Sequence, residues 1–154
     1  MSPGPYLNTG PFRTAITAND ATQQEELGVW RFEAGKILRY VRAGALIPRF
    51  ESVRGQFDVT TAALMGNQVL QTSAATDIFF GVAETTLASL NFGWITTYGR
   101  ATARVVAGEI PGSPLGPSST TGVLTIRNTS HFNAVALALQ SGLSAGSAIF
   151  IAML

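Results

Sequence analysis

The sequence predicts an all-β protein, an antiparallel β-barrel or β-sandwich of jelly-roll-like form with an extended N-terminal arm. Residues 81–93 and 134–146 share one plan, in which an apolar run, a small or polar turn and a glycine lead into a second apolar run. Glycines at Gly35, Gly44 and Gly55 divide the preceding region at intervals typical of short strands. No helical pattern alternates with these runs, so parallel βαβ units are not expected.

Residues 1–27 are expected to form the arm, and residues 28–154 the β-domain. The arm contains Pro3, Pro5 and Pro11 with many Thr, Asn and Gln, but few large apolar side chains. Such a segment buries too little apolar surface to fold alone. We therefore expect the arm to become ordered on a partner, with a disordered tail as the alternative.

The first third of the β-domain favours short strands. Apolar and polar residues alternate over 29–33 and again over 46–53, as in a half-buried strand. Pro48 directs the second of these strands toward a sheet edge or a bulge, because proline cannot donate a backbone hydrogen bond. A helix over 33–41 is an alternative, which Gly35 disfavours.

The middle of the chain becomes more strand-like toward its end. Residues 60–75 are ambiguous between a helix and a turn between strands, and the central Gly66 favours the turn. Residues 78–83 form a continuous apolar run of the kind found in strands buried on both faces. Residues 94–106 are expected to form a hairpin that reverses at Gly99.

Residues 108–122 contain three prolines and a serine–threonine run. We expect a long loop of about 15 residues, a kind that is commonly functional or mobile. Apolar runs at 123–126, 134–139 and 149–154 then predict the last strands and place the C-terminus within the sheet. The whole chain is expected to contain roughly eight to ten short strands.

The composition favours a protein that is covered by partners. Of the 154 residues, 46% are hydrophobic and 12% are charged, about half the usual charged fraction. Obligate interfaces resemble a protein interior, so a surface this apolar suits them. A membrane protein is the alternative, but no apolar run reaches the about 18 residues of a spanning helix. Residues 1–10 lack the features of a signal peptide, so we expect no membrane partner and a protein that is made and used without export.

Recognisable catalytic, metal and cofactor motifs are absent from the sequence. The lack of cysteine excludes disulfides, thiolate nucleophiles and Cys-based metal sites. The single histidine, His131, follows a serine but stands in no triad pattern. Acids that could form a carboxylate pair are scattered along the chain, at Asp58, Asp77, Glu84 and Glu109. We therefore expect no enzyme activity, no cofactor, no metal and no small-molecule substrate.

Charge is concentrated in one segment. Residues 31–54 contain six basic and two acidic residues, a net +4, whereas the whole chain carries +1. Arginine suits partly buried ion pairs because its guanidinium is weakly hydrated. Interleaved aromatics make single-stranded nucleic acid an alternative partner, which the small total charge disfavours. The interface candidates are Arg31, Arg39, Arg42, Arg49, Arg54, Trp30 and, in the arm, Phe12.

The C-terminal half carries a recognisable series of motifs. Phe80-Gly81-Val82-Ala83 is followed by Gly93-Trp94-Ile95-Thr96-Thr97-Tyr98-Gly99 and then by a small-residue strand at 101–106. A Gly/Pro/Ser segment at 112–122 and apolar runs at 134–137 and 148–154 complete the series. In these features the chain resembles the capsid decoration (cement) proteins of tailed bacteriophages.

The resemblance implies a virion structural protein on the outer surface of an icosahedral head. Such a protein is expected to form a homotrimer at local threefold positions and to bridge subunits of the major capsid protein, which stabilises the capsid. A phage tail, head–tail connector or fibre module is the alternative. From a different class, a carbohydrate-binding or enzymatic β-domain would require a cleft with clustered acids or aromatics around Trp94 and Tyr98.

Overall fold

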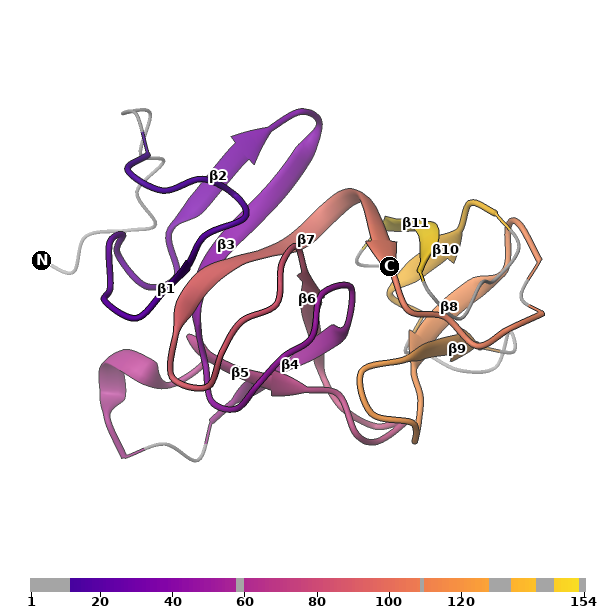
Figure 1. Ribbon diagram of the computed structural model, residues 1–154. Helices are drawn as coiled ribbons and strands as arrows, with labels where there is room; N and C mark the ends of the chain where they lie inside the picture. Colours follow the sequence, from indigo (N-terminus) through magenta and orange to yellow (C-terminus); the bar gives the residue numbers. More distant parts are fainter. Residues whose placement is uncertain (1–11, 58–59, 109, 128–133, 141–145, 153–154) are drawn as a thin grey trace, which may run out of the picture.

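The computed structural model describes residues 12–57, 60–108, 110–127, 134–140 and 146–152 (Figure 1). Within these residues the fold is all-β, as predicted, and one 3₁₀ turn, η1 at Ala62–Leu64, is the sole helical element. The eleven strands are β1 Asn19–Asp20, β2 Trp30–Glu33, β3 Lys36–Ala43, β4 Ser52–Gln56, β5 Gln68–Gln71, β6 Phe79–Ala83, β7 Phe92–Ala103, β8 Pro114–Pro117, β9 Leu124–Ile126, β10 Ala136–Ala138 and β11 Ser147–Ile151.

Five strands close into a first ring, in the order β3–β5–β4–β6–β7–β3. The β3–β5 pair is parallel and the other four pairs are antiparallel. Closure removes the unpaired edges that an open sheet would expose. The ring encloses a core made of Val41, Ala43, Ile47, Val53, Val69, Ala83, Leu87 and Ile95.

A second ring shares β7 with the first and lies beside it, on the right in Figure 1. The C-terminal part of β7 pairs with β11, and the sheet continues through β10 and β8 to β9. The ring is closed by β9, because Leu124 bridges to Val105, which follows β7, and the Leu124 N–H donates to the Arg104 carbonyl at 2.9 Å. The core of this ring contains Phe79, Val82, Ala101, Ala103, Val105, Leu115, Leu124, Ala136, Ala138, Ile149 and Ile151.

The repeated sequence plan corresponds to two antiparallel strand pairs. β6 pairs with β7, where Val82 lies opposite Thr96, and β10 pairs with β11, where Leu137 lies opposite Phe150. The alternative helix over 33–41 does not form, because this stretch belongs to the β2–β3 hairpin. The two pairs explain why both copies of the plan contain a turn between apolar runs.

The hairpin predicted for residues 94–106 is wrong, because β7 runs without reversal through Gly99. Gly99 has a φ of 96°, and a Cβ at this position would lie 2.5 Å from the carbonyl oxygen of Gly35. Before Gly99 the strand pairs with β3 and β6, and from Gly99 onward it pairs with β11. The glycine therefore lets one strand bend from the first ring into the second.

Two further segment predictions are corrected. The expected loop at 108–122 contains β8, whose Leu115 is fully buried between β10 and β9. Proline is tolerated there because Pro114 and Pro117 occupy the two ends of the strand. The expected strand at 46–53 is mostly a turn: Phe50 has a φ of 70°, and β4 begins only at Ser52.

The described part of the arm, residues 12–27, packs on the outer face of β3 and β7. β1 pairs with β7, where Asn19 lies opposite Gly93. The indole N–H of Trp94 donates to the Thr14 hydroxyl at 3.0 Å. Phe12, Ile16, Ala18 and Leu27 cover a core cluster formed by Val29, Leu38, Tyr40 and Trp94. This part of the arm is therefore joined to the domain by packing, whereas residues 1–11 lie outside the described residues.

A buried polar junction joins the two rings. Glu51 is 2% exposed, and its carboxylate accepts hydrogen bonds from the side chains of Gln71 and Arg104. Close by, the Ser52 N–H donates to the Gly122 carbonyl at 2.9 Å, and the Arg104 N–H donates to the Phe50 carbonyl at 2.8 Å. These bonds tie the start of β4 to segments of the second ring.

Candidate interface

Two of the predicted interface residues are engaged within the chain. The Arg31 guanidinium lies 5.0 Å from the centre of the Phe12 ring and 5.6 Å from that of Trp94. It also donates to the Thr14 carbonyl at 2.7 Å. Phe12 packs edge-on against Trp94, with ring centres 5.3 Å apart. Cation–π contacts of this kind stabilise a fold, so Arg31 and Phe12 fasten the arm to the domain.

Arg39 and Trp30 lie together near the end of the first ring. The Arg39 guanidinium is 5.6 Å from the Trp30 ring centre and 5.4 Å from that of Phe80. It also donates to the Asn67 side-chain oxygen at 2.7 Å. Burial lowers the pKa of Arg39, but an arginine pKa is so high that the group stays charged at neutral pH. Both side chains are half-buried, and the Arg39 guanidinium has these contacts within the chain, although its buried Nε has no hydrogen-bond partner among the described residues.

The remaining three arginines differ in exposure. The Arg42 guanidinium lies 5.9 Å from the centre of the Phe92 ring, and the Arg54 Nε lies 3.7 Å from the Asp77 carboxylate. Arg49 is exposed, although its guanidinium lies 4.3 Å from the Phe50 ring centre. The seven candidates therefore lie in separate contacts and do not form one patch. Among the five candidate arginines, Arg49 is the exposed one.

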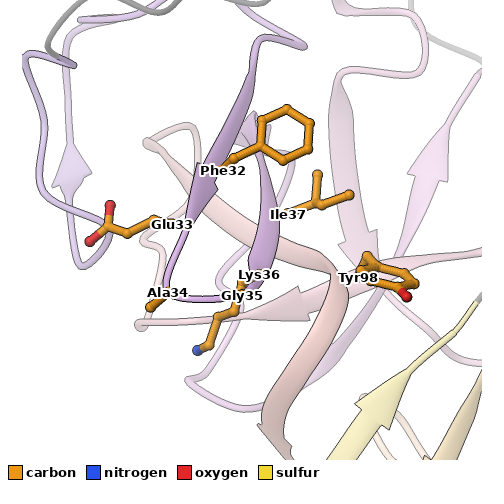
Figure 2. Close-up of a pocket in the computed structure, with 7 residues that line it drawn as sticks. All are labelled: Phe32, Glu33, Ala34, Gly35, Lys36, Ile37 and Tyr98. Atoms are coloured by element: carbon orange, nitrogen blue, oxygen red, sulfur yellow. The ribbon is translucent and has the colours of Figure 1, made fainter.

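A shallow apolar pocket, which sequence reasoning missed, lies beside the β2–β3 hairpin (Figure 2). Its volume is about 410 Å³, and its lining includes Phe32, Ile37 and Tyr98. Phe32 is 60% exposed and Tyr98 is 44% exposed. The ring of Tyr98 packs edge-on against Phe150 of β11, with centres 5.5 Å apart. Exposed aromatics beside a hollow are typical of a binding surface.

The sequence contained one usable signal for this pocket. In Trp30-Arg31-Phe32-Glu33 every second residue is aromatic, but the pattern alone assigns both aromatics to the core side. In the structure Phe32, two residues before the hairpin turn, is 60% exposed, whereas Trp30 is half-buried beside Arg39. Trp94 and Tyr98 also differ in exposure, because the arm buries Trp94 completely and leaves Tyr98 exposed. The carbohydrate-binding alternative therefore loses Trp94 as a platform.

The acids considered for catalysis have structural partners where the structure describes them. Asp77 accepts hydrogen bonds from the N–H groups of Ser73 and Ala74, at 2.6 and 2.9 Å. Glu84 pairs with Lys36 at 2.9 Å. The other residues singled out, Asp58, Glu109 and His131, lie outside the described residues. Across the described ranges no three His, Asp or Glu side chains gather as metal ligands would.

Within the same described ranges, none of the helical structure has the length and apolarity required to cross a membrane.

The comparison with known proteins identifies a similar fold. The chain resembles the crystal structure of the head fiber gp8.5 N base of bacteriophage phi29, with a TM-score of 0.53 and 10% sequence identity. The match covers 75% of this chain and 93% of the other. No protein-family model matches the sequence, and no curated protein is significantly similar to it. At this identity the likeness concerns the backbone fold.

Proposed function

We propose that this chain is a structural protein of a phage virion, which binds the outer surface of the head and stabilises it by bridging subunits of the major capsid protein. The observation that carries the proposal is the fold likeness to a phage head fiber base over most of both chains. The motif series in residues 80–154 supports it separately, because that series is a property of the sequence and not of the backbone fold. The low charge content supports it further.

The proposed mechanism is added interface and contains no catalytic step. A protein that binds the assembled shell, and not its separated subunits, stabilises the shell by RT ln(1 + [L]/Kd). This amounts to about 2.7 kcal/mol per site when the free concentration is 100 times Kd. If the shell expands during maturation, a site that exists only in the expanded form also shifts the equilibrium toward that form. Many modest contacts thereby give a large total effect.

The exposed residues suggest where the contact lies. Arg49 and the pair formed by Phe32 and Tyr98 present an exposed cation and exposed aromatics, which are residue types enriched at interfaces. Residues 1–11 are a second candidate, as the outer part of the expected arm. The threefold grouping of copies that the sequence resemblance implies remains a separate expectation.

The test is reconstitution on heads that lack this protein. Purified expanded heads are incubated with increasing amounts of the chain, and bound copies per head are counted after sedimentation. We expect saturable binding to the head lattice and a higher temperature of head disruption. Absence of binding to heads, together with its presence on isolated tails, would move the protein to the tail. A protein absent from purified virions would overturn the proposal altogether.

A head fibre base is the second candidate, and the fold likeness favours it specifically. A decoration protein lies flat on the lattice, whereas a fibre base carries a projection away from the head. Cryo-electron microscopy of virions labelled with an antibody against this chain separates the two. Label confined to the roots of projecting fibres would support the fibre base, and label over the whole head surface would support decoration.

A further inference from the structure

The outer edge of β2 has no partner strand among the described residues. β2 pairs with β3 on one side, and within the described residues no strand pairs with its other side. The hairpin turn consists of Ala34 and Gly35, whose φ angles of 49° and 74° suit a type I′ turn. Glu33 and Lys36 close this turn and direct their backbone groups toward each other. Because antiparallel residues alternate, the N–H and C=O of Phe32 point to the free edge.

Among the described residues, β2 has little of the usual protection of an edge strand beyond Glu33, whose side chain is 41% exposed. Proteins protect edges with proline, bulges or charged side chains that project outward. β2 contains no proline, and its cation Arg31 is folded back over the Phe12 and Trp94 rings. The side chain of Phe32 is instead 60% exposed at the rim of the apolar pocket. An edge of this kind is a template for another strand.

The sequence of this edge is complementary to itself. Arg31-Phe32-Glu33 places an aromatic residue between a cation and an anion. When two such triplets run antiparallel with Phe32 opposite Phe32, each Arg31 lies opposite the Glu33 of the second copy. Within one chain Arg31 and Glu33 already form an ion pair on the same face of β2. The register with Arg31 opposite Arg31 would instead set like charges against each other, which disfavours pairing.

We propose that β2 pairs with β2 of a second copy of this chain, antiparallel and around a two-fold axis at Phe32. Such an interface uses the same patch on both copies, as two-fold symmetry requires. It also joins two apolar rows, because Phe32 lies opposite Ile37 and Ile37 lies opposite Tyr98 in the sheet. The two exposed Phe32 rings then cover each other. This inference rests on the hairpin and does not depend on the proposed function.

The contact is short, so its strength depends on concentration. One strand pair buries less area than a standard stable interface, and a weak dimer in solution is expected. Where copies are held close together on a larger assembly, the effective concentration is high and the same contact becomes occupied.

Charge exchange gives the first test. In R31E positions 31 and 33 are both acidic, and in E33R both are basic. Each variant therefore sets like charges opposite each other in a dimer with itself. Dimerisation of each variant, measured by sedimentation velocity over a concentration series, should weaken at least about tenfold. An equimolar mixture should form a mixed dimer about as strong as the wild type, because every cross-strand pair is then opposite in charge. Thermal unfolding of each variant checks that it is folded.

A cysteine cross-link gives the second test and does not depend on the charged residues. The chain has no cysteine, so F32C introduces a single thiol. Hydrogen-bonded antiparallel partners have Cα atoms about 5.5 Å apart, which suits a disulfide. F32C should form a covalent dimer under mild oxidation. L46C is the control, because Leu46 is similarly exposed at a site away from β2.

The following results would overturn the proposal. A wild type that stays monomeric at the highest concentration would do so, as would a trimeric mass, which would favour the threefold arrangement. Failure of the R31E and E33R mixture to form mixed dimers, with both variants folded, would also do so. If dimers appear only after deletion of residues 2–11, the edge is covered by the chain's own N-terminal segment. Equal cross-linking of F32C and L46C would indicate random collision.

Discussion

Replacing Arg104 with methionine should destabilise the protein more than replacing Glu51 with glutamine. The Glu51 side chain is 3% exposed, and Arg104 is its charged partner at the junction of the two rings. R104M leaves a buried carboxylate to which, among the described residues, only the Gln71 amide still donates. Breaking a buried ion pair from one side costs about 3–5 kcal/mol. The Arg104 side chain is 43% exposed, so water can enter the vacated space and we expect about 2–3 kcal/mol.

E51Q removes the charge but keeps the shape and one hydrogen-bond acceptor. Arg104 then loses the negative charge of its partner but remains in contact with solvent, and the expected cost is about 1 kcal/mol. The double variant contains no buried charge, so it should be more stable than R104M alone. Urea unfolding of the four proteins measures these differences, provided that the m-value is unchanged. The reasoning would be refuted by an E51Q as unstable as R104M, or by a double variant whose loss equals the sum of the single losses.

Three further predictions concern other parts of the fold. G99A should lower the unfolding free energy by about 2–4 kcal/mol, because the φ of 96° and the nearby Gly35 oxygen both oppose a Cβ. G112A is the comparison: its φ is 85° but no atom lies within 4 Å of the added Cβ, so the loss measured from denaturant midpoints should be only about 1 kcal/mol. Burial raises the pKa of Tyr40, so the unfolded chain releases the phenol proton at a lower pH than the folded chain does, and stability is lost as the pH rises above about 10. The unfolding free energy of Y40F should therefore decline less steeply than that of the wild type between about pH 10 and 12, and an unchanged slope would contradict this. Deletion of residues 1–27 should unfold the chain or greatly lower its melting temperature, because it uncovers Trp94, whereas deletion of residues 2–11 leaves this contact in place.

The last of these predictions reverses an expectation drawn from the sequence. The composition of residues 1–27 favours an arm that orders on a partner, and deletion of such an arm would leave the domain folded. In the structure, Phe12 and Thr14 contact Trp94 instead. Thr14 and Trp94 are 80 positions apart in the sequence. Local composition contains no information about a contact at that separation.

The arginines show the same limit. The sequence places Arg31, Arg39 and Arg42 in a basic segment, and a segment suggests one basic surface. Strand geometry sends alternate side chains to opposite faces. Arg31 lies opposite Leu38, on the face that the arm covers. Arg39 follows Leu38 in β3 and therefore lies on the other face, where it contacts the Phe80 ring. The sequence pattern shows that cations and aromatics are interleaved in this region, but the sheet decides which aromatic each cation contacts.

The sequence by itself determined the all-β class, the short strands and the two glycine-containing strand pairs, because alternation and turn residues are local properties of the chain. Only the tertiary structure decided that β7 continues through Gly99 to serve two rings, that Pro114–Pro117 forms a strand, and that Phe32 remains exposed on the strand that ends the described sheet. The physical reason is that a strand is completed by its neighbour. Which neighbour it finds depends on hydrogen bonds and packing between residues far apart in the chain, and these are set only when the rings close.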